Sequence, residues 1–356
     1  LILCLVVRIF LKPMMVLFGA TPEVLDYSLT YTGITSLGFP FLILATGGSN
    51  LVRADGSPTY SMLCTLSGAV LNTILDPVFI FGLDMGVAGG ALATVLGQAL
   101  SLVMVLYYLF RTRIRTIRLT AASLHPSGPL LRAICSLGVS PFLNQMAMFL
   151  VQITLNNTLT YYGALSHYGE DIPLACVGVI SKVNILMLGF TLGISQGCQP
   201  IFSYNYGARN PGRVRRAFQV LLMACLAYSL LLWALVQLFP QLFALMFTSD
   251  SELVSYASWA LRIYMAATGI FGIQIACQQT FVALGNAKIS LFLAVLRKII
   301  LLIPFIYILP NFFADKAFAV FLAEPVADFL AVCTTATMFA VHFKKSMTAL
   351  EGKPGV

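Results

Sequence analysis

The chain has 356 residues, of which 59% are hydrophobic and only 10% are charged, and its formal net charge is +8. A soluble globular domain usually carries about 25% charged residues, so this composition excludes a soluble protein and indicates a membrane protein. The eight cysteines are scattered singly, with no CxxC or Cys/His cluster, so neither a disulfide framework nor a metal site is indicated.

Apolar stretches recur along the whole chain, and each is near or above the roughly 20 residues that a spanning helix needs. We expect ten membrane spans, at 1–18, 27–52, 59–81, 86–110, 130–162, 173–202, 217–247, 253–283, 287–311 and 317–343. The predicted fold class is therefore an all-α polytopic membrane protein.

Basic residues are sorted between alternate loops of this arrangement. Fourteen lie on one side: Arg53, Arg111, Arg113, Arg115, Arg118, Arg132, Arg209, Arg213, Arg215, Arg216, Lys288, Lys344, Lys345 and Lys353. Only Lys12 and Lys316 lie on the other side. The positive-inside rule places the basic loops and the C-terminus in the cytoplasm, so the net charge does not point to nucleic acid as a partner.

Span 59–81 carries an acid within the apolar run 69–82, Asp76, and an amide one helical turn before it, Asn72. An ionised acid in lipid costs about 3 kcal/mol or more, so such residues usually serve ions or substrates. The i, i+4 spacing puts both side chains on one helix face, and Pro77 removes a backbone donor beside them. The pair predicts a cation or proton site. The alternative is an acid at a helix end that faces interfacial water.

Amide side chains mark two later spans. In 130–162, Gln145, Gln152 and Asn156 recur at helical spacing, and they either line a cavity or form interhelical hydrogen bonds. At the cytoplasmic end of 173–202, proline and amides predict a broken helix end whose freed carbonyls are satisfied by side chains. These residues, expected to form a structural or gating hinge, are Gln196, Gln199, Pro200 and Asn205. Lys182 is an intramembrane cation whose partner the sequence does not identify.

The last span carries two acids at i, i+4, Glu324 and Asp328. Two nearby carboxylates raise one pKa, which suits a secondary proton site or a binder of cationic substrates. Span 287–311 offers Arg297 and Lys298, so the alternative is an internal ion pair that fixes helix packing.

An internal repeat relates the two halves of the chain at an offset of 229 residues. The matching pairs are Phe18/Phe247, Glu23/Glu252, Tyr27/Tyr256, Ile34/Ile263, Ala54/Ala283 and Gly56/Gly285. Spans 27–52 and 59–81 then superimpose on 253–283 and 287–311, as in transporters built from parallel repeats. The same offset leads us to expect about 100 further residues before Leu1, since 129 minus 229 is −100.

The repeat also predicts the domains and singles out the polar pair. We expect a partial N-terminal lobe at 1–110, a basic cytoplasmic linker at 111–128, a C-terminal lobe at 129–345 and a cytoplasmic tail at 346–356. The offset places Leu301 opposite Asn72 and Phe305 opposite Asp76. Because the second copy manages without the polar pair, the architecture does not require it, which favours a functional role.

Five segments resemble the multidrug and toxic compound extrusion (MATE) family, in its bacterial MepA/DinF-like branch. They are LVRADGSP at 51–58, LNTILDPVFIFG at 71–82, GVAGGALAT at 86–94, QGCQPIFSYNYGA at 196–208 and AEPVAD at 323–328. The resemblance implies two six-helix lobes, with about the first two helices of the N-lobe missing. It also implies a secondary antiporter of the bacterial inner membrane that exports amphipathic, often cationic, drugs in exchange for H⁺ or Na⁺.

The family's N-lobe cation site combines an acid on the first helix, an Asn and an Asp on the fifth, and a Thr on the sixth. Asn72, Asp76 and Thr94 match the last three, and the first-helix acid would precede this sequence. Another branch uses acids on its seventh and tenth helices, but 130–162 and 253–283 contain no Asp or Glu. That C-lobe site is therefore not expected.

The main alternative is a flippase for lipid-linked saccharides on a related two-lobe fold, which a strongly cationic cavity would favour. An intramembrane enzyme would need a catalytic nucleophile, metal ligands or a His/acid constellation, and the sequence shows none of these arrangements. ATP-driven transport would need a Gly-x-x-x-x-Gly-Lys-Ser/Thr loop, which does not occur either. We expect no cofactor, no metal beyond a possible Na⁺ at Asp76, and a monomer in the bilayer that handles small organic molecules.

Overall fold

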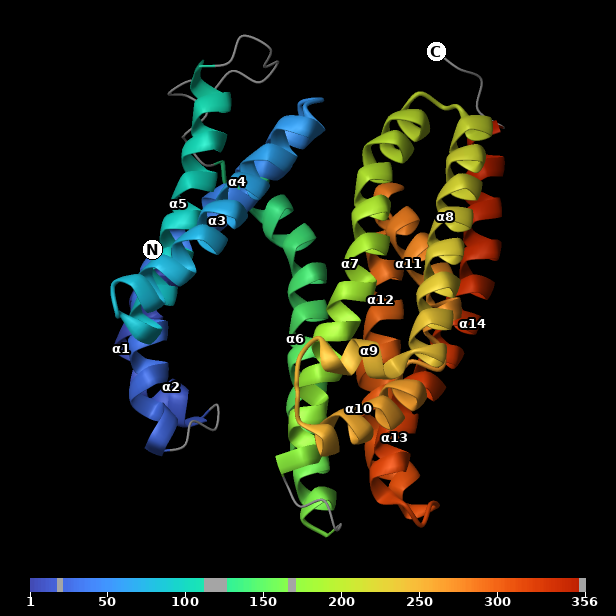
Figure 1. The fold of residues 1–356 in the computed structure, drawn as a ribbon. Coiled ribbons are helices and arrows are strands. Elements are labelled where there is room, and N and C mark those ends of the chain that lie inside the picture. The colour runs from blue at the N-terminus through green and yellow to red at the C-terminus, as the bar shows by residue number, and fades with distance from the viewer. Residues whose placement is uncertain (18–21, 112–126, 166–170, 352–356) are drawn as a thin grey trace. The chain divides into compact units, whose positions relative to one another are not determined.

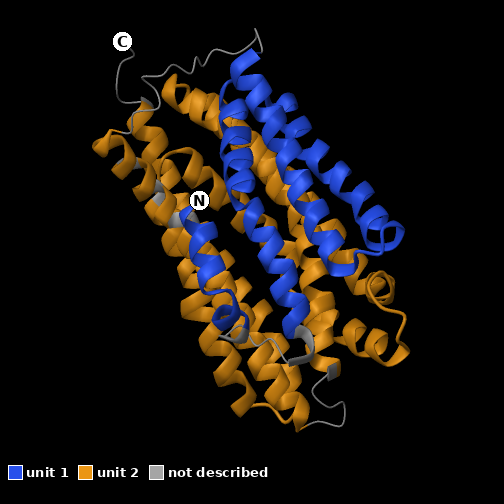
Figure 2. Ribbon diagram, turned by 90° about the vertical axis from the view of Figure 1, so that its left-hand side faces the viewer, with its two compact units in different colours: residues 1–126 blue, residues 127–356 orange. Residues whose placement is uncertain are grey.

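The computed structural model describes residues 1–17, 22–111, 127–165 and 171–351, and within these ranges the chain forms helices and no strands (Figure 1). It divides into two compact units, residues 1–126 and 127–356, which are coloured separately in Figure 2. Most of the expected linker, 112–126, lies outside the described residues.

Unit 1 is built on three long helices. Its elements are α1 (Ile2–Ile9), α2 (Leu11–Leu17), α3 (Pro22–Ala54), α4 (Pro58–Pro77), the π-helix η1 (Val78–Gly82) and α5 (Gly86–Arg111). Both α3 and α4 pack against α5. The expected span 1–18 is not one helix, because the chain breaks at Phe10 into two short helices, and it stays a prediction as a span. Pro13 explains the break: it cannot donate to Ile9, and its ring crowds that carbonyl.

Unit 2 contains the other helices. They are α6 (Gly128–Ala164), α7 (Asp171–Gly207), α8 (Pro211–Leu238), α9 (Pro240–Leu245), α10 (Ser251–Tyr264), α11 (Thr268–Ala283), α12 (Ala287–Val295), the π-helix η3 (Leu296–Leu302), α13 (Ile303–Ile308), the 3₁₀ turn η4 (Leu309–Asn311) and α14 (Lys316–Glu351). Its largest apolar core is shared by α6, α7, α10 and α14, around Leu159, Ile180, Leu261 and Phe321. Helix α14 continues to Glu351, into the segment that was expected to be a tail.

Seven helices in the described part of the chain are long and apolar enough to cross a membrane, or up to eight if the bent pair α10–α11 is one span. Large apolar side chains are exposed on these helices, for example Phe81, Ile185 and Phe190. A water-facing surface of this kind would aggregate, whereas lipid accepts it. The chain is therefore an all-helical membrane protein that crosses the bilayer several times. The expected span 130–162 is the single helix α6 and stays a prediction as a span.

Two other expected spans are interrupted. The segment 217–247 ends its helix at Leu238, because Pro240 disfavours helical geometry at Phe239 and starts α9. The segment 253–283 bends by 52° between α10 and α11. Side chains of α8 satisfy carbonyls near this bend: Trp233 Nε1 donates to Ala266 O at 2.9 Å, and Gln237 Nε2 donates to Arg262 O at 2.9 Å.

The helix boundaries recur at the offset found in the sequence. Adding 229 to the bounds of α3 gives 251–283, which are the outer bounds of α10 and α11. The turns that follow also match, since Gly56 and Gly285 have φ of 84° and 81°. In each turn the next residue donates to the carbonyl five positions back, Ser57 to Val52 and Asn286 to Phe281. This left-handed cap is one that glycine adopts without a Cβ penalty.

Candidate functional site

Helices α4 and α5 approach so closely that their backbones touch. A Cβ added to Gly97 would lie 2.6 Å from Gly68 O, and one added to Gly68 would lie 2.5 Å from Gly97 O. Small residues permit this kind of contact between membrane helices. The same contact seats Asn72 against α5, because its Cβ lies 3.2 Å from the position of a Cβ on Gly97.

One turn further along, the structure joins two of the predicted polar residues, Asn72 and Asp76, beside α5. Asn72 Nδ2 donates to Asp76 Oδ1 at 3.2 Å, and both side chains are partly buried. Asp76 Oδ1 lies 4.0 Å from the position of a Cβ on Gly90 of α5. Thr94 Oγ1 donates to Gly90 O at 2.9 Å, which leaves its lone pairs available as acceptors. The Asp76 carboxylate therefore faces α5 at Gly90, one helical turn before Thr94.

No basic side chain in the described parts of the chain forms an ion pair with Asp76. The π-helix η1 follows Asp76 at once, where Pro77 interrupts the regular hydrogen-bond ladder. Such π segments often occur at functional sites. The arrangement offers a carboxylate, an amide oxygen and a hydroxyl, which are the hard oxygen donors that a small cation prefers.

The acids of α14 are in a different situation, because they belong to a buried ionic quartet with two bases of η3. Arg297 pairs with Asp328 and, at 3.0 Å, with Glu324, and Lys298 Nζ lies 3.3 Å from Glu324 Oε1. The Arg297 guanidinium also lies 4.2 Å from the centroid of the Phe271 ring. The ion-pair alternative is thus present in the structure. Phe271 was missed, since one aromatic residue in an apolar span gives no signal.

The amides of α6 do not point into the core of unit 2. Gln145 and Gln152 are exposed and Asn156 is partly buried, whereas Ala147 and Val151 make the buried face. Gln152 Nε2 donates to Asn156 Oδ1 at 3.0 Å within the same helix. Within the described residues these two amides therefore bond to each other along the helix.

The predicted break between Gln196 and Asn205 is wrong, because α7 continues through Pro200 to Gly207. Asn205 Nδ2 donates to Ile201 O at 2.8 Å, which satisfies one carbonyl near the proline by a side chain. Gln199 Nε2 donates to Gln279 Oε1 of α11 at 2.7 Å. Lys182 has an aromatic neighbour that the sequence did not reveal, since its Nζ lies 5.5 Å from the centroid of the Phe247 ring.

Comparison with known proteins gives a consistent result. A family model described as MatE matches residues 1–78 and 145–308. The multidrug export protein MepA of Staphylococcus aureus (strain NCTC 8325 / PS 47) is 26% identical over 356 residues, which cover 99% of this chain and 75% of that protein. The MepA of Staphylococcus haemolyticus (strain JCSC1435) is 26% identical over 317 residues, covering 88% and 68%.

Solved structures show the same fold. An outward-facing multidrug resistance MATE family transporter of the MOP superfamily has a TM-score of 0.87 and 22% identity, and the match covers 99% of this chain and 77% of that one. An inward-facing structure of such a transporter has a TM-score of 0.74 and 21% identity, covering 99% and 79%.

Proposed function

The chain belongs to the MatE family of transporters, and from this premise we propose that it is a secondary antiporter coupled through Asp76. It exports amphipathic, often cationic, organic compounds in exchange for H⁺ or Na⁺. The multidrug export proteins that it resembles support this class of substrate. The proposed setting is the bacterial inner membrane, with the basic loops and the C-terminus in the cytoplasm and the protein acting as a monomer.

The observation that carries the proposal is a carboxylate in a membrane span without a basic partner among the described residues. Glu324 and Asp328 each pair with a base, whereas Asp76 has only the Asn72 amide. An unpaired charge in a low-dielectric setting is costly, so the carboxylate should be stabilised by a proton or a bound cation. The repeat supports the same inference, because the equivalent positions are Leu301 and Phe305.

The residues around Asp76 suggest how binding or release of an ion at its carboxylate changes the geometry of the helix. In this proposal a cation at this carboxylate is also bound by Oδ1 of Asn72, once that amide turns over, and by the hydroxyl of Thr94, while a proton needs Asp76 alone. Loss of the ion leaves a charge beside Pro77 and η1, where the helix changes from α to π geometry. An ion that favours one of two helix geometries shifts the equilibrium between them. In this proposal, Pro77 permits that change, and Gln196, Gln199, Pro200 and Asn205 serve as a hinge of α7.

We do not favour the lipid-linked saccharide flippase. Its sequence signal would be a strongly cationic cavity, but Arg297 and Lys298 are neutralised by Glu324 and Asp328. A secondary proton or substrate role for these two acids would have to compete with their ion pairs. The amides Gln145, Gln152 and Asn156 remain candidates for substrate contact, on the part of α6 that unit 2 leaves uncovered.

The test uses Asp76→Asn, which fixes the neutral state and keeps the size of the side chain. In proteoliposomes loaded with a fluorescent lipophilic cation, we expect gradient-driven efflux to be abolished, because ion release no longer changes the charge at this position. Asp84→Asn is the matched control. Asp84 is exposed in the same unit, and its φ of 52° suits asparagine.

Separate arms impose a pH gradient or a Na⁺ gradient, with equal amounts of protein in the membrane. Asn72→Leu removes an oxygen donor and keeps the acid, so a Na⁺-coupled protein should lose efflux and an H⁺-coupled one should retain most of it. Wild-type efflux by Asp76→Asn in both arms would refute the role assigned to this carboxylate.

A further inference from the structure

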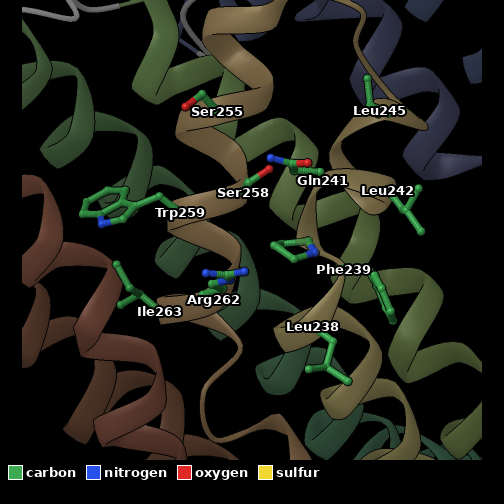
Figure 3. A pocket seen from close by; sticks show the side chains of 11 residues that line it. Leu238, Phe239, Gln241, Leu242, Leu245, Ser255, Ser258, Trp259, Arg262 and Ile263 are labelled. Carbon is green, nitrogen blue, oxygen red and sulfur yellow. The ribbon is translucent and has the colours of Figure 1, made fainter.

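A pocket lies in unit 2, between the end of α8, α9 and α10, and none of the acids discussed above lines it. Its volume is about 750 Å³ (Figure 3). Pro240 and Gln241 contribute from α9, and Ser255, Trp259 and Arg262 contribute from α10. The pocket exists because Pro240 ends α8 and turns the chain, and because α10 diverges from α11 by 52°.

The pocket contains a basic side chain without an acidic partner. Arg262 is exposed, and within the described residues its guanidinium forms no ion pair. Figure 3 shows Arg262, Ser258 and Gln241 lying around the same space between α10 and α9. Ser258 Oγ donates to Val254 O at 2.6 Å, so its remaining lone pairs can accept a hydrogen bond. Arginine and amide donors in one open space suit a ligand with anionic oxygens.

Most of the remaining lining is apolar, and its three leucines are exposed. Leu238, Leu242 and Leu245 are 67%, 62% and 54% exposed. Trp259 is 37% exposed and also lines the pocket, with its ring against Phe318 and Phe321 of α14. Tryptophan and arginine side chains with an apolar body and a polar end are typical of the membrane–water interface. The pocket therefore has a polar part and an apolar part, as a phospholipid has a headgroup and acyl chains.

The position along α8 agrees with an interfacial site. Helix α8 begins at Pro211, next to the basic residues Arg209 and Arg213, and the pocket lies at its other end. Under the orientation predicted from the loops, this end is at the non-cytoplasmic side of the bilayer. A cationic drug would be repelled by Arg262, so the pocket does not suit the substrates proposed above.

We propose that this pocket binds the phosphodiester headgroup of an anionic phospholipid, with Arg262 on the phosphate and the exposed leucines against the acyl chains. The headgroup oxygens accept from the guanidinium and the Gln241 amide, and the Trp259 ring borders the glycerol region. Bound lipid would hold α9 and α10 together at the turn that follows α8. This site does not depend on the antiport mechanism.

The experiment measures lipid retention by the full protein. Protein purified from vesicles of phosphatidylcholine with 30% phosphatidylglycerol is analysed by native mass spectrometry, and its thermal midpoint is recorded with each lipid. We expect retained phosphatidylglycerol and a higher midpoint than with phosphatidylcholine alone. Arg262→Gln should lower the apparent affinity for phosphatidylglycerol about tenfold, which corresponds to 1.4 kcal/mol. Arg262→Lys keeps the positive charge but loses the planar guanidinium that can donate two parallel hydrogen bonds. Its apparent affinity for phosphatidylglycerol should lie between those of the wild type and Arg262→Gln.

Lys12→Gln is the matched control, because it removes an exposed cation from the same predicted side in unit 1. It should retain phosphatidylglycerol as the wild type does. Equal retention by Arg262→Gln and the wild type would overturn the proposal, as would equal stabilisation by phosphatidylcholine. Competition by soluble glycerophosphoglycerol as strong as that by the lipid would also overturn it, since it would show a site for free phosphodiesters. Loss of transport by Asp76→Asn leaves all of these readouts unchanged.

Discussion

Removing Arg297 should destabilise unit 2 more than removing any other member of the ionic quartet. Asp328 pairs with Arg297 alone, whereas Glu324 also has Lys298. Glu324 and Asp328 are only 4% and 6% exposed. Breaking a buried pair by deleting one partner costs about 3–5 kcal/mol, because a charge is left uncompensated. In Arg297→Met the apolar stem still covers Phe271, so the loss should come mainly from charge.

The assay uses intrinsic fluorescence, because both tryptophans of the chain, Trp233 and Trp259, lie in unit 2. In detergent we expect Arg297→Met to lower the thermal midpoint by roughly 6–20 °C, if a unit of this size loses about 2–4 °C per kcal/mol. Asp328→Asn should cost less, since Arg297 keeps Glu324. The double variant should recover most of the loss, because the remaining Lys298–Glu324 pair is neutral. A double variant as unstable as Arg297→Met, or wild-type stability in Arg297→Met, would refute this reasoning.

Two further predictions concern glycines. Gly97→Ala should lower the free energy of unfolding by about 1–3 kcal/mol and impair efflux, since its Cβ would lie 2.6 Å from Gly68 O and 3.2 Å from Asn72 Cβ. The thermal midpoint followed by circular dichroism measures the loss. Gly47→Ala is the control, because its Cβ would meet nothing within 4 Å. Gly56→Ala and Gly285→Ala should each lower the free energy of unfolding by about 1–2 kcal/mol. Both glycines have positive φ, and neither Cβ would meet an atom within 4 Å, so the loss should be purely conformational. Denaturant titration checks this, and losses that differ by several kcal/mol between the two variants would argue against it.

Sequence patterns predicted the helices better than their interruptions. The expected span 86–110 is α5 within one residue, because apolar length and composition decide where a helix can cross. The bend between α10 and α11 was missed because the groups that stabilise it lie on another helix: Trp233 and Gln237 of α8 donate to Ala266 O and Arg262 O. Pro200 led to the opposite error, a predicted break that is not there. Helix α7 continues through Pro200, and Asn205 Nδ2 donates to Ile201 O.

The part of the site that lies on one helix was predictable, whereas the part that depends on contacts between helices was not. The i, i+4 spacing alone placed Asn72 and Asp76 on one face, and their hydrogen bond follows from it. That this face meets Gly90 and Gly97 could not be read from the sequence, because it depends on how α4 crosses α5. The quartet was foreseen only as one of two alternatives, since spacing along α14 does not show which face of η3 it meets.

The ionic quartet has a consequence for how a membrane voltage acts on the protein. Its two positive and two negative side chains sum to zero, so displacing the group as a whole through the field does almost no electrical work. Moving one elementary charge through a full potential of 100 mV involves about 2.3 kcal/mol. Among the acids discussed above, a voltage can therefore bias the carboxylate of Asp76, which has no basic partner among the described residues, far more than the quartet. The quartet therefore lets unit 2 bury four charged side chains that add almost nothing to its response to the membrane potential.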